Sequence, residues 1–281
     1  NELKIISIGA LDQFKLNLDI EDPDEEQEYI LSFIPVNEQW NYAIGAVFKH
    51  YMEKSYQTFV LSRNMLNNIN YKYPDNDESR SRILDYESQE IENKFRFENT
   101  RISDKFRFVY GVSAEYVKYQ NSTYQQLFIS DSLIEVDYDS FLDFYKWGLF
   151  FQASKKLLKD KLTVSFGIRS DANNYSESMQ NLLNQLSPRL SVSYALNKKF
   201  SVNFNTGKYF QLPAFTTLGY RDNEGVLQNK VNNLKYIGVN HIIYGIEYRL
   251  KPEIIFTIEG FHKKYSNYPF SLRDSISLAN K

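Results

Sequence analysis

The stretch LTVSFGIR, residues 162–169, alternates apolar and polar side chains without a break: Leu, Val, Phe and Ile stand at even positions, and Thr, Ser, Gly and Arg at odd ones. Successive side chains of a β-strand point to opposite faces, so a period of two predicts a strand with one apolar and one polar face. The alternation recurs at 190–196, 200–205 and 91–100, and the last of these places Glu92, Lys94, Arg96 and Glu98 on one face. The sequence therefore predicts an antiparallel all-β protein.

Short polar turns alternate with much longer polar loops along the whole chain. This rhythm is typical of bacterial outer-membrane β-barrels, whose tilted strands are joined by short turns on one side of the membrane and long loops on the other. We expect an antiparallel up-and-down transmembrane β-barrel. The short connections are predicted at Gly9–Asp12, Met52–Ser55, Arg101–Lys105, Lys155–Lys161, Leu196–Lys199 and Leu250–Glu253, and the long ones at Asp19–Glu38, Asn64–Glu87, Gln120–Ser140, Tyr175–Ser187, Gln211–Lys235 and from Ser266 onward.

Twelve strands are predicted between these connections. A soluble antiparallel sheet with one face in water would show the same alternation, so periodicity alone leaves both readings open. The number of strands that share the pattern favours the membrane. The predicted strands are 3–8, 13–18, 39–51, 56–64, 87–100, 106–119, 141–154, 162–174, 188–195, 200–210, 236–249 and 254–265.

Composition agrees with a barrel and excludes several other classes. The 281 residues include 22 Tyr and 21 Phe, and many of these stand near predicted strand ends, where interfacial aromatic girdles lie. No apolar run reaches the roughly 18 residues of a transmembrane helix. The absence of Cys excludes a disulfide framework. The basic clusters of the sequence are confined to predicted turns and lack interleaved aromatic residues, so we expect no nucleic-acid partner.

A search for catalytic or metal-binding motifs finds none. The three histidines, His50, His241 and His262, stand on separate predicted strands without a second ligand at metal-site spacing, and no nucleotide-binding or nucleophile motif is present. The acidic run in 19–38 is read as a solvated loop, with a Ca²⁺ site as the alternative. We expect no enzyme activity, no metal and no cofactor.

The second half of the chain resembles a known family. The run LSPRLSVSY at 186–194 is followed one hairpin later by FNTGKYFQLP at 204–213. This order of an SPR strand start and an aromatic strand end that closes on Pro is similar to the barrel of TonB-dependent outer-membrane receptors. The stretches 259–269 and 277–281 resemble receptors of this family from Bacteroidetes. Over 1–185 the resemblance is carried by the strand rhythm.

The resemblance implies a 22-stranded barrel around an N-terminal plug, which imports a scarce or large ligand with energy from the TonB complex. Residues 1–281 would be a single barrel segment of about twelve strands, and the plug, the TonB contact and the remaining strands would lie outside this chain. The implied partners are the TonB complex, the imported ligand, which would be a siderophore, vitamin, oligosaccharide or peptide, and outer-membrane lipid.

The lumenal wall and the long loops supply the candidate ligand-binding residues. The candidates are the inward-facing Arg169 and Asp171, then Tyr209, Phe210 and Gln211 at the mouth, and Tyr220, Arg221 and Asp222 in the loop above. Ordinary lumen polarity and loop solvation would explain the same residues. A second functional class stays open, a surface module without transport that grips a glycan or a protein through its long loops.

Overall fold

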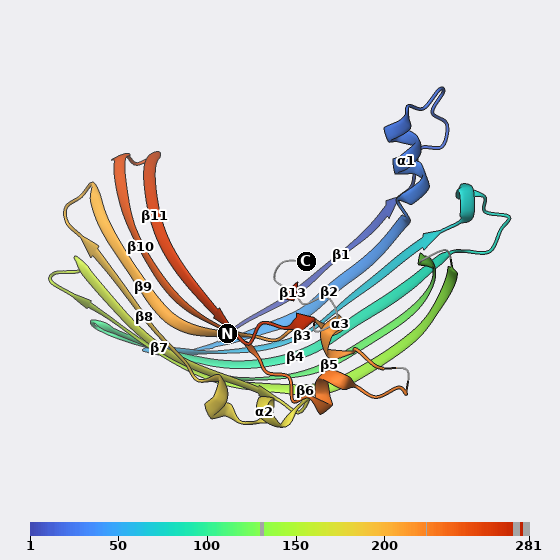
Figure 1. The fold of residues 1–281 in the computed structure, drawn as a ribbon. Helices are drawn as coiled ribbons and strands as arrows, with labels where there is room; N and C mark the ends of the chain where they lie inside the picture. The colour runs from blue at the N-terminus through green and yellow to red at the C-terminus, as the bar shows by residue number, and fades with distance from the viewer. Residues whose placement is uncertain (130–131, 223, 272–275, 278–281) are drawn as a thin grey trace.

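A computed structural model describes residues 1–129, 132–222, 224–271 and 276–277. Eleven consecutive antiparallel strands form one sheet in the order β1 to β11, with each strand hydrogen-bonded to its neighbours in sequence. Figure 1 shows this sheet as a deeply curved trough. The strands are β1 (Glu2–Phe14), β2 (Val36–Tyr51), β3 (Ser55–Lys72), β4 (Leu84–Ser103), β5 (Phe106–Ile129), β6 (Ser132–Leu157), β7 (Leu162–Asn173), β8 (Ser187–Ala195), β9 (Phe200–Gln211), β10 (Ile237–Lys251) and β11 (Ile254–Ser266).

The sheet is an open part of a barrel, as the sequence predicts. Among the described residues no ladder joins β1 to β11, so the sheet does not close on itself. A short separate hairpin, β12 (Phe270–Ser271) and β13 (Ile276–Ser277), follows β11. The last residues of the family-like C-terminal stretch, 278–281, lie outside the described residues. Within the described part of the chain, no helix is long and apolar enough to cross a membrane.

Five of the six predicted short turns are confirmed, and the first one is wrong. The stretch Gly9–Asp12 is extended, because β1 pairs with β2 without interruption from Glu2 opposite Lys49 to Phe14 opposite Asn37. The predicted strands 3–8 and 13–18 are therefore one strand, and the count falls from twelve to eleven. Gly9 lies opposite Tyr42 in this ladder, so the glycine is part of an extended strand and not of a turn.

The predicted long loops contain more regular structure than the sequence indicates. Residues 120–140 are mostly hairpin, because β5 and β6 run to 24 and 26 residues and pair as far as Ile129 opposite Ser132. A transmembrane strand needs only about 9–11 residues, so in a membrane-spanning sheet much of this hairpin would lie beyond the bilayer. Outside lipid neither face must be apolar, and the alternation that reveals a strand is lost there.

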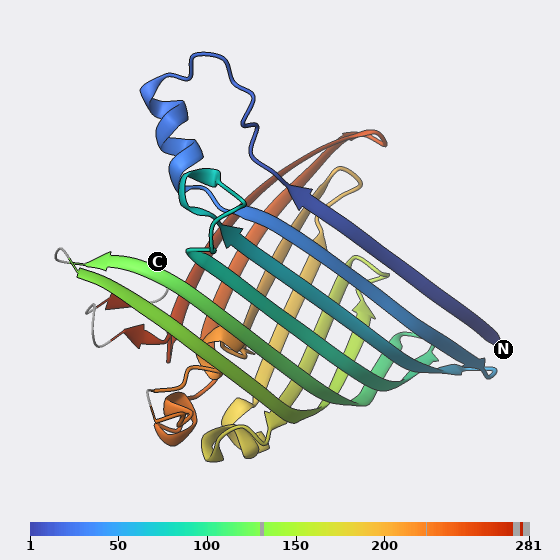
Figure 2. The same cartoon turned by 90° about the vertical axis from the view of Figure 1, so that its right-hand side faces the viewer.

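Helices occupy other long connections, at the end of the strands opposite the N-terminus (Figure 2). The helix α1 (Glu25–Phe33) replaces the loop expected at 19–38, and its first turn is held by a capping box in which Asp24 and Gln27 exchange hydrogen bonds of 2.8 and 2.9 Å. The remaining elements at this end are η1 (Pro74–Asn76), α2 (Glu177–Gln180), η2 (Leu182–Gln185), α3 (Phe215–Leu218) and α4 (Gln228–Val231).

Cross-strand register assigns the side chains to two faces. Directly opposite residues share a face, so the pairs Lys94 with Glu115 and Glu115 with Lys146 place these charges together. The other face carries Leu61, opposite Phe95, and Leu149. Leu61 and Leu149 are 65% and 49% exposed, whereas the side chains of Lys146 and Glu115 are 22% and 20% exposed. The charged face is the crowded, concave one, and the apolar face is the convex one.

Candidate functional site

The concave face changes character toward the long loops. There, Val117 and Tyr119 of β5 and Leu142 and Phe144 of β6 are buried, although they share the face of Glu115 and Lys146. They are covered by residues of the two connections that follow β7 and β9. This loop cluster consists of those four strand residues together with Tyr175, Met179, Leu218 and Tyr236. Two long connections are thus packed against the wall at the mouth of the trough.

Hydrogen bonds fix the two connections to each other. The Tyr175 hydroxyl donates to the Leu218 carbonyl at 2.7 Å, and the Asn173 amide donates to the Tyr236 hydroxyl at 2.9 Å. Burial raises the pKa of Tyr236 to about 12, so its hydroxyl stays neutral at physiological pH. Both hydroxyls satisfy buried polar atoms that would otherwise be costly to enclose.

The predicted lumenal residues Arg169 and Asp171 form a bidentate ion pair just below the loop cluster. Arg169 Nε lies 2.6 Å from Asp171 Oδ2, and Nη2 lies 2.7 Å from Oδ1. The pair lines a cavity of about 160 Å³ together with Glu115, Lys146 and Tyr236. Lys146 Nζ in turn lies 2.5 Å from Glu115 Oε2. The charges around this cavity are therefore paired before any ligand arrives.

The three predicted residues at the end of β9 have different surroundings. Tyr209 lies under the guanidinium of Arg189, which is 4.4 Å from its ring centroid. Phe210 packs against the loop cluster and lines the same small cavity as Arg169. Gln211 is exposed at the strand end. Of these three, only Phe210 is brought to the cavity of the Arg169–Asp171 pair.

Two of the three predicted loop residues hold the loop in shape. Arg221 donates from Nη2 to the Phe141 carbonyl at 2.7 Å, and from its backbone N–H to the Tyr138 hydroxyl at 2.8 Å. The Asp222 carboxylate accepts from the Val226 N–H at 2.8 Å, and this hydrogen bond is the main cause that lowers the pKa of Asp222. The Tyr220 side chain is 53% exposed. Tyr220 is therefore the residue of the three whose side chain is free to meet a solute.

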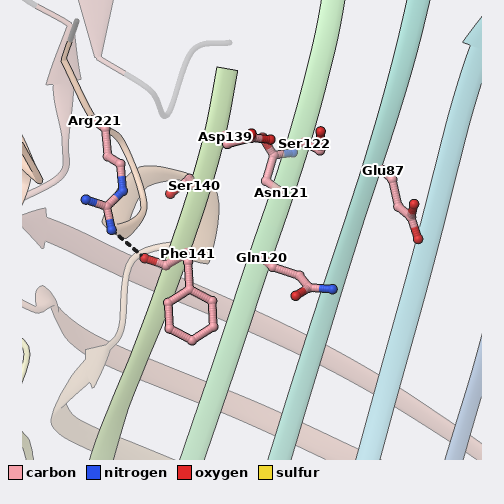
Figure 3. Close-up of a pocket in the computed structure, with 8 residues that line it drawn as sticks. All are labelled: Glu87, Gln120, Asn121, Ser122, Asp139, Ser140, Phe141 and Arg221. Atoms are coloured by element: carbon pink, nitrogen blue, oxygen red, sulfur yellow. Dashed lines mark hydrogen bonds between the residues drawn. The ribbon is translucent and has the colours of Figure 1, made fainter. Parts of the chain in front are cut away.

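A second cavity lies beside Arg221 and was not foreseen from the sequence. It measures about 430 Å³, and Figure 3 shows the side chains that line it. Its carboxylates, Glu87 and Asp139, come from β4 and β6, and Ser122 of β5 is the cross-strand partner of both. The sequence predicts long loops at 64–87 and 120–140, so nothing in it indicated that these polar residues would be aligned. The described residues contain no group of three or more His, Cys, Asp or Glu that could hold a metal ion.

Comparison with known families decides what this sheet is. The family model described as TonB dependent receptor-like, beta-barrel matches residues 12–280. The chain belongs to the TonB-dependent receptor β-barrel family. It is accordingly an outer-membrane protein of a receptor family and not an enzyme, as the sequence predicts. A search of curated protein sequences finds no match.

Solved structures of TonB-dependent receptors and related transporters have the same fold. The copper transporter OprC aligns with a TM-score of 0.57 and 15% identity over 83% of this chain and 40% of the transporter. For a mutant of the ferric enterobactin receptor PfeA from Pseudomonas aeruginosa the TM-score is 0.60, with 12% identity over 94% of this chain and 42% of the receptor. The siderophore receptor PirA from Acinetobacter baumannii aligns with a TM-score of 0.57 and 15% identity over 82% of this chain and 35% of the receptor.

The chain therefore spans about two fifths or less of the length of these three proteins. Identities this low establish the shared fold alone. They assign none of the ligands of those proteins to this TonB-dependent receptor chain.

Proposed function

We propose that this chain forms part of the wall of an outer-membrane importer that takes up a scarce or large ligand. The observation that carries the proposal is the two-faced sheet, with a charged concave face that ends under two interlocked loops. A lipid-facing wall around a polar lumen requires such an arrangement. The ligand would be a siderophore, vitamin, oligosaccharide or peptide.

The proposed ligand contacts lie where the lumen meets the loops. Phe210 and the exposed Tyr220 offer aromatic surface, and Gln211 offers a free amide. Arg169 and Asp171 offer a donor and an acceptor, although each already satisfies the other. A ligand that engages them would have to compete with this pair, so they would serve selectivity more than affinity. Tyr209, Arg221 and Asp222 would act by shaping the wall and the loop.

We further propose that the plug and the TonB contact belong to parts of the receptor outside residues 1–281. Energy coupling would then reach this wall only through the plug. The similarity of 259–269 and 277–281 to receptors from Bacteroidetes supports a receptor of that type. No nucleic acid is expected among the partners, because the lysine-rich run at 155–161 stands in a short turn.

Nutrient-limited growth of the native host tests this function. The intact strain, a strain without the receptor and a strain without TonB would be grown on ferric siderophores, a vitamin, oligosaccharides or peptides as the only source of the limiting nutrient. We expect one of these classes to support growth only when both the receptor and TonB are present. Equal growth of all three strains on every class would contradict the proposal.

A loop variant sharpens the test of the site. Tyr220→Ala in the intact receptor should reduce uptake at low nutrient concentration while surface expression stays normal. Leu183→Ala is the matched control, because Leu183 is also exposed in a long connection, at 76%. If both variants reduce uptake equally, Tyr220 has no special part in binding.

A further inference from the structure

The concave face carries a cluster of arginines between β4 and β8, outside the loop cluster. Four of them line a hollow of about 350 Å³: Arg96 on β4, Arg107 on β5, Arg169 on β7 and Arg189 on β8. This volume lies within the range of small-molecule pockets. We call this hollow the arginine niche. It differs from the cavity beneath the loop cluster, with which it shares only Arg169.

Register explains why the niche exists. The pairs Gln152 with Gly167 and Gly167 with Arg189 run across three strands on the charged face. Gly167 has no side chain, so the wall is hollowed between the flanking guanidinium groups. A Cβ atom added at Gly167 would meet the Phe151 carbonyl oxygen at 3.7 Å, an ordinary van der Waals contact, so a side chain can be placed there without a clash.

The charges around the niche do not balance. Arg96 is paired with Glu98, with Nη2 2.6 Å from Oε2, and Arg169 is paired with Asp171. Among the described residues neither Arg107 nor Arg189 takes part in an ion pair. Arg189 has only the Ser187 hydroxyl at 3.3 Å and the Tyr209 ring beneath it. Two guanidinium groups thus face one hollow without an anionic partner on the wall.

We infer that the arginine niche binds an anionic group, a carboxylate or a phosphate. Guanidinium forks match the paired oxygens of these groups and bind them with two parallel hydrogen bonds. The anion is carried either by a solute that passes through the lumen or by an acidic side chain from another part of the receptor. This inference rests on the proposed lumenal position of the concave face. It adds a site that shares only Arg169 with the proposed ligand contacts.

Binding of small anions to the full-length receptor in detergent tests the niche. The probes are citrate and pyrophosphate, with sucrose as a neutral control, followed by calorimetry. We expect saturable binding of at least one anion and none of sucrose. The double variant R107Q/R189Q should weaken anion binding at least about tenfold for each guanidinium removed. Gly167→Leu, which fills the hollow and keeps every charge, should abolish it.

Arg63→Gln is the matched control, because Arg63 stands on the opposite face and donates to Tyr42 and Asn93 at 2.9 Å. If an acidic side chain of the receptor already fills the niche, free anions will not bind. R107Q/R189Q should then lower Tm by clearly more than R63Q does, and added salt should shrink that difference. The inference is overturned if R107Q/R189Q and Gly167→Leu leave anion binding unchanged. It is also overturned if no anion binds and R107Q/R189Q lowers Tm no more than R63Q does.

A failure of the niche is distinguishable from a failure of the proposed function. TonB-dependent growth on one nutrient class tests import and does not require the niche. If growth does not depend on the receptor and TonB while anion binding is intact, the importer is rejected and the anion site is retained.

Discussion

The convex and concave faces of the sheet are built from the same strands but follow different rules. Along β7 and β8 the convex face presents Val164 opposite Val192 and Phe166 opposite Leu190, apolar residues that continue from strand to strand. The concave face of the same strands presents Ser165, Gly167 and Arg189. Where the concave face becomes apolar at Val117 and Phe144, loops cover it. On β7 and β8 the exposed apolar surface therefore belongs to the convex face, and a lipid solvent stabilises that arrangement.

The largest expected effect falls on the covered part of the concave face. Leu218 is fully buried in the loop cluster. Leu218→Ala should destabilise the two packed connections by about 2–5 kcal/mol, because it removes buried methyl groups and leaves a cavity. Hydrogen exchange of residues 174–186 and 212–236 measures the change. Leu183→Ala, at an exposed position, should leave exchange unaltered, and equal effects of the two would show that the loops are not packed on the wall.

A slightly smaller effect is expected when a charge is placed on the convex face and compared with the same charge at the neighbouring position on the concave face. Val192→Arg places a charge on the convex face and should cost about 2–4 kcal/mol of folding free energy near the bilayer midplane. Ser193→Arg places the same charge on the concave face and should cost far less. Urea titration of the full-length receptor in lipid vesicles measures both. Equal costs would remove the distinction between the faces.

The smallest effect concerns the pH dependence of the loop that contains Asp222. The pKa of this carboxyl is lowered mainly by its hydrogen bond from the Val226 N–H. A folded pKa below the unfolded one gives stability that is present above the ordinary pKa of Asp, near 4, and is lost as pH falls through the lowered value. Protection of the Val226 amide should therefore weaken below pH 4, relative to the Asp222→Asn variant at each pH. The same pH trend in both proteins would assign it to another group.

How much the sequence predicts depends on the solvent around each strand. Inside lipid, alternation such as that of 162–169 locates the strands, and five short turns were predicted correctly. Beyond the lipid the rule fails, because 120–129 and 132–140 form a ladder with polar residues on both faces. The first turn failed because Gly9 and Asp12 are common in turns, whereas pairing with β2 keeps them extended.

The candidate site was predicted less completely than the fold. Alternation alone places Arg169 and Asp171 on one face, and the structure brings them together as a pair. Contacts between residues far apart in sequence, such as Arg221 with Phe141, depend on how loops fold back onto strands. The Asp222 carboxylate accepts a hydrogen bond within its own turn, from the Val226 N–H, and composition cannot reveal this contact. The arginine niche likewise requires the register of five strands, from β4 to β8, before its charges can be seen to converge.

Spin-label accessibility tests the central claim most directly. A nitroxide would be attached to a single cysteine that replaces Val192 or Ser193 in the full-length receptor in lipid vesicles. Residues 1–281 contain no other cysteine. Collision rates with oxygen, which concentrates in lipid, would be compared with those for a water-soluble nickel chelate. We predict that oxygen dominates at position 192 and the nickel chelate at position 193. Equal accessibility to the nickel chelate at both positions would contradict a lipid-facing convex surface.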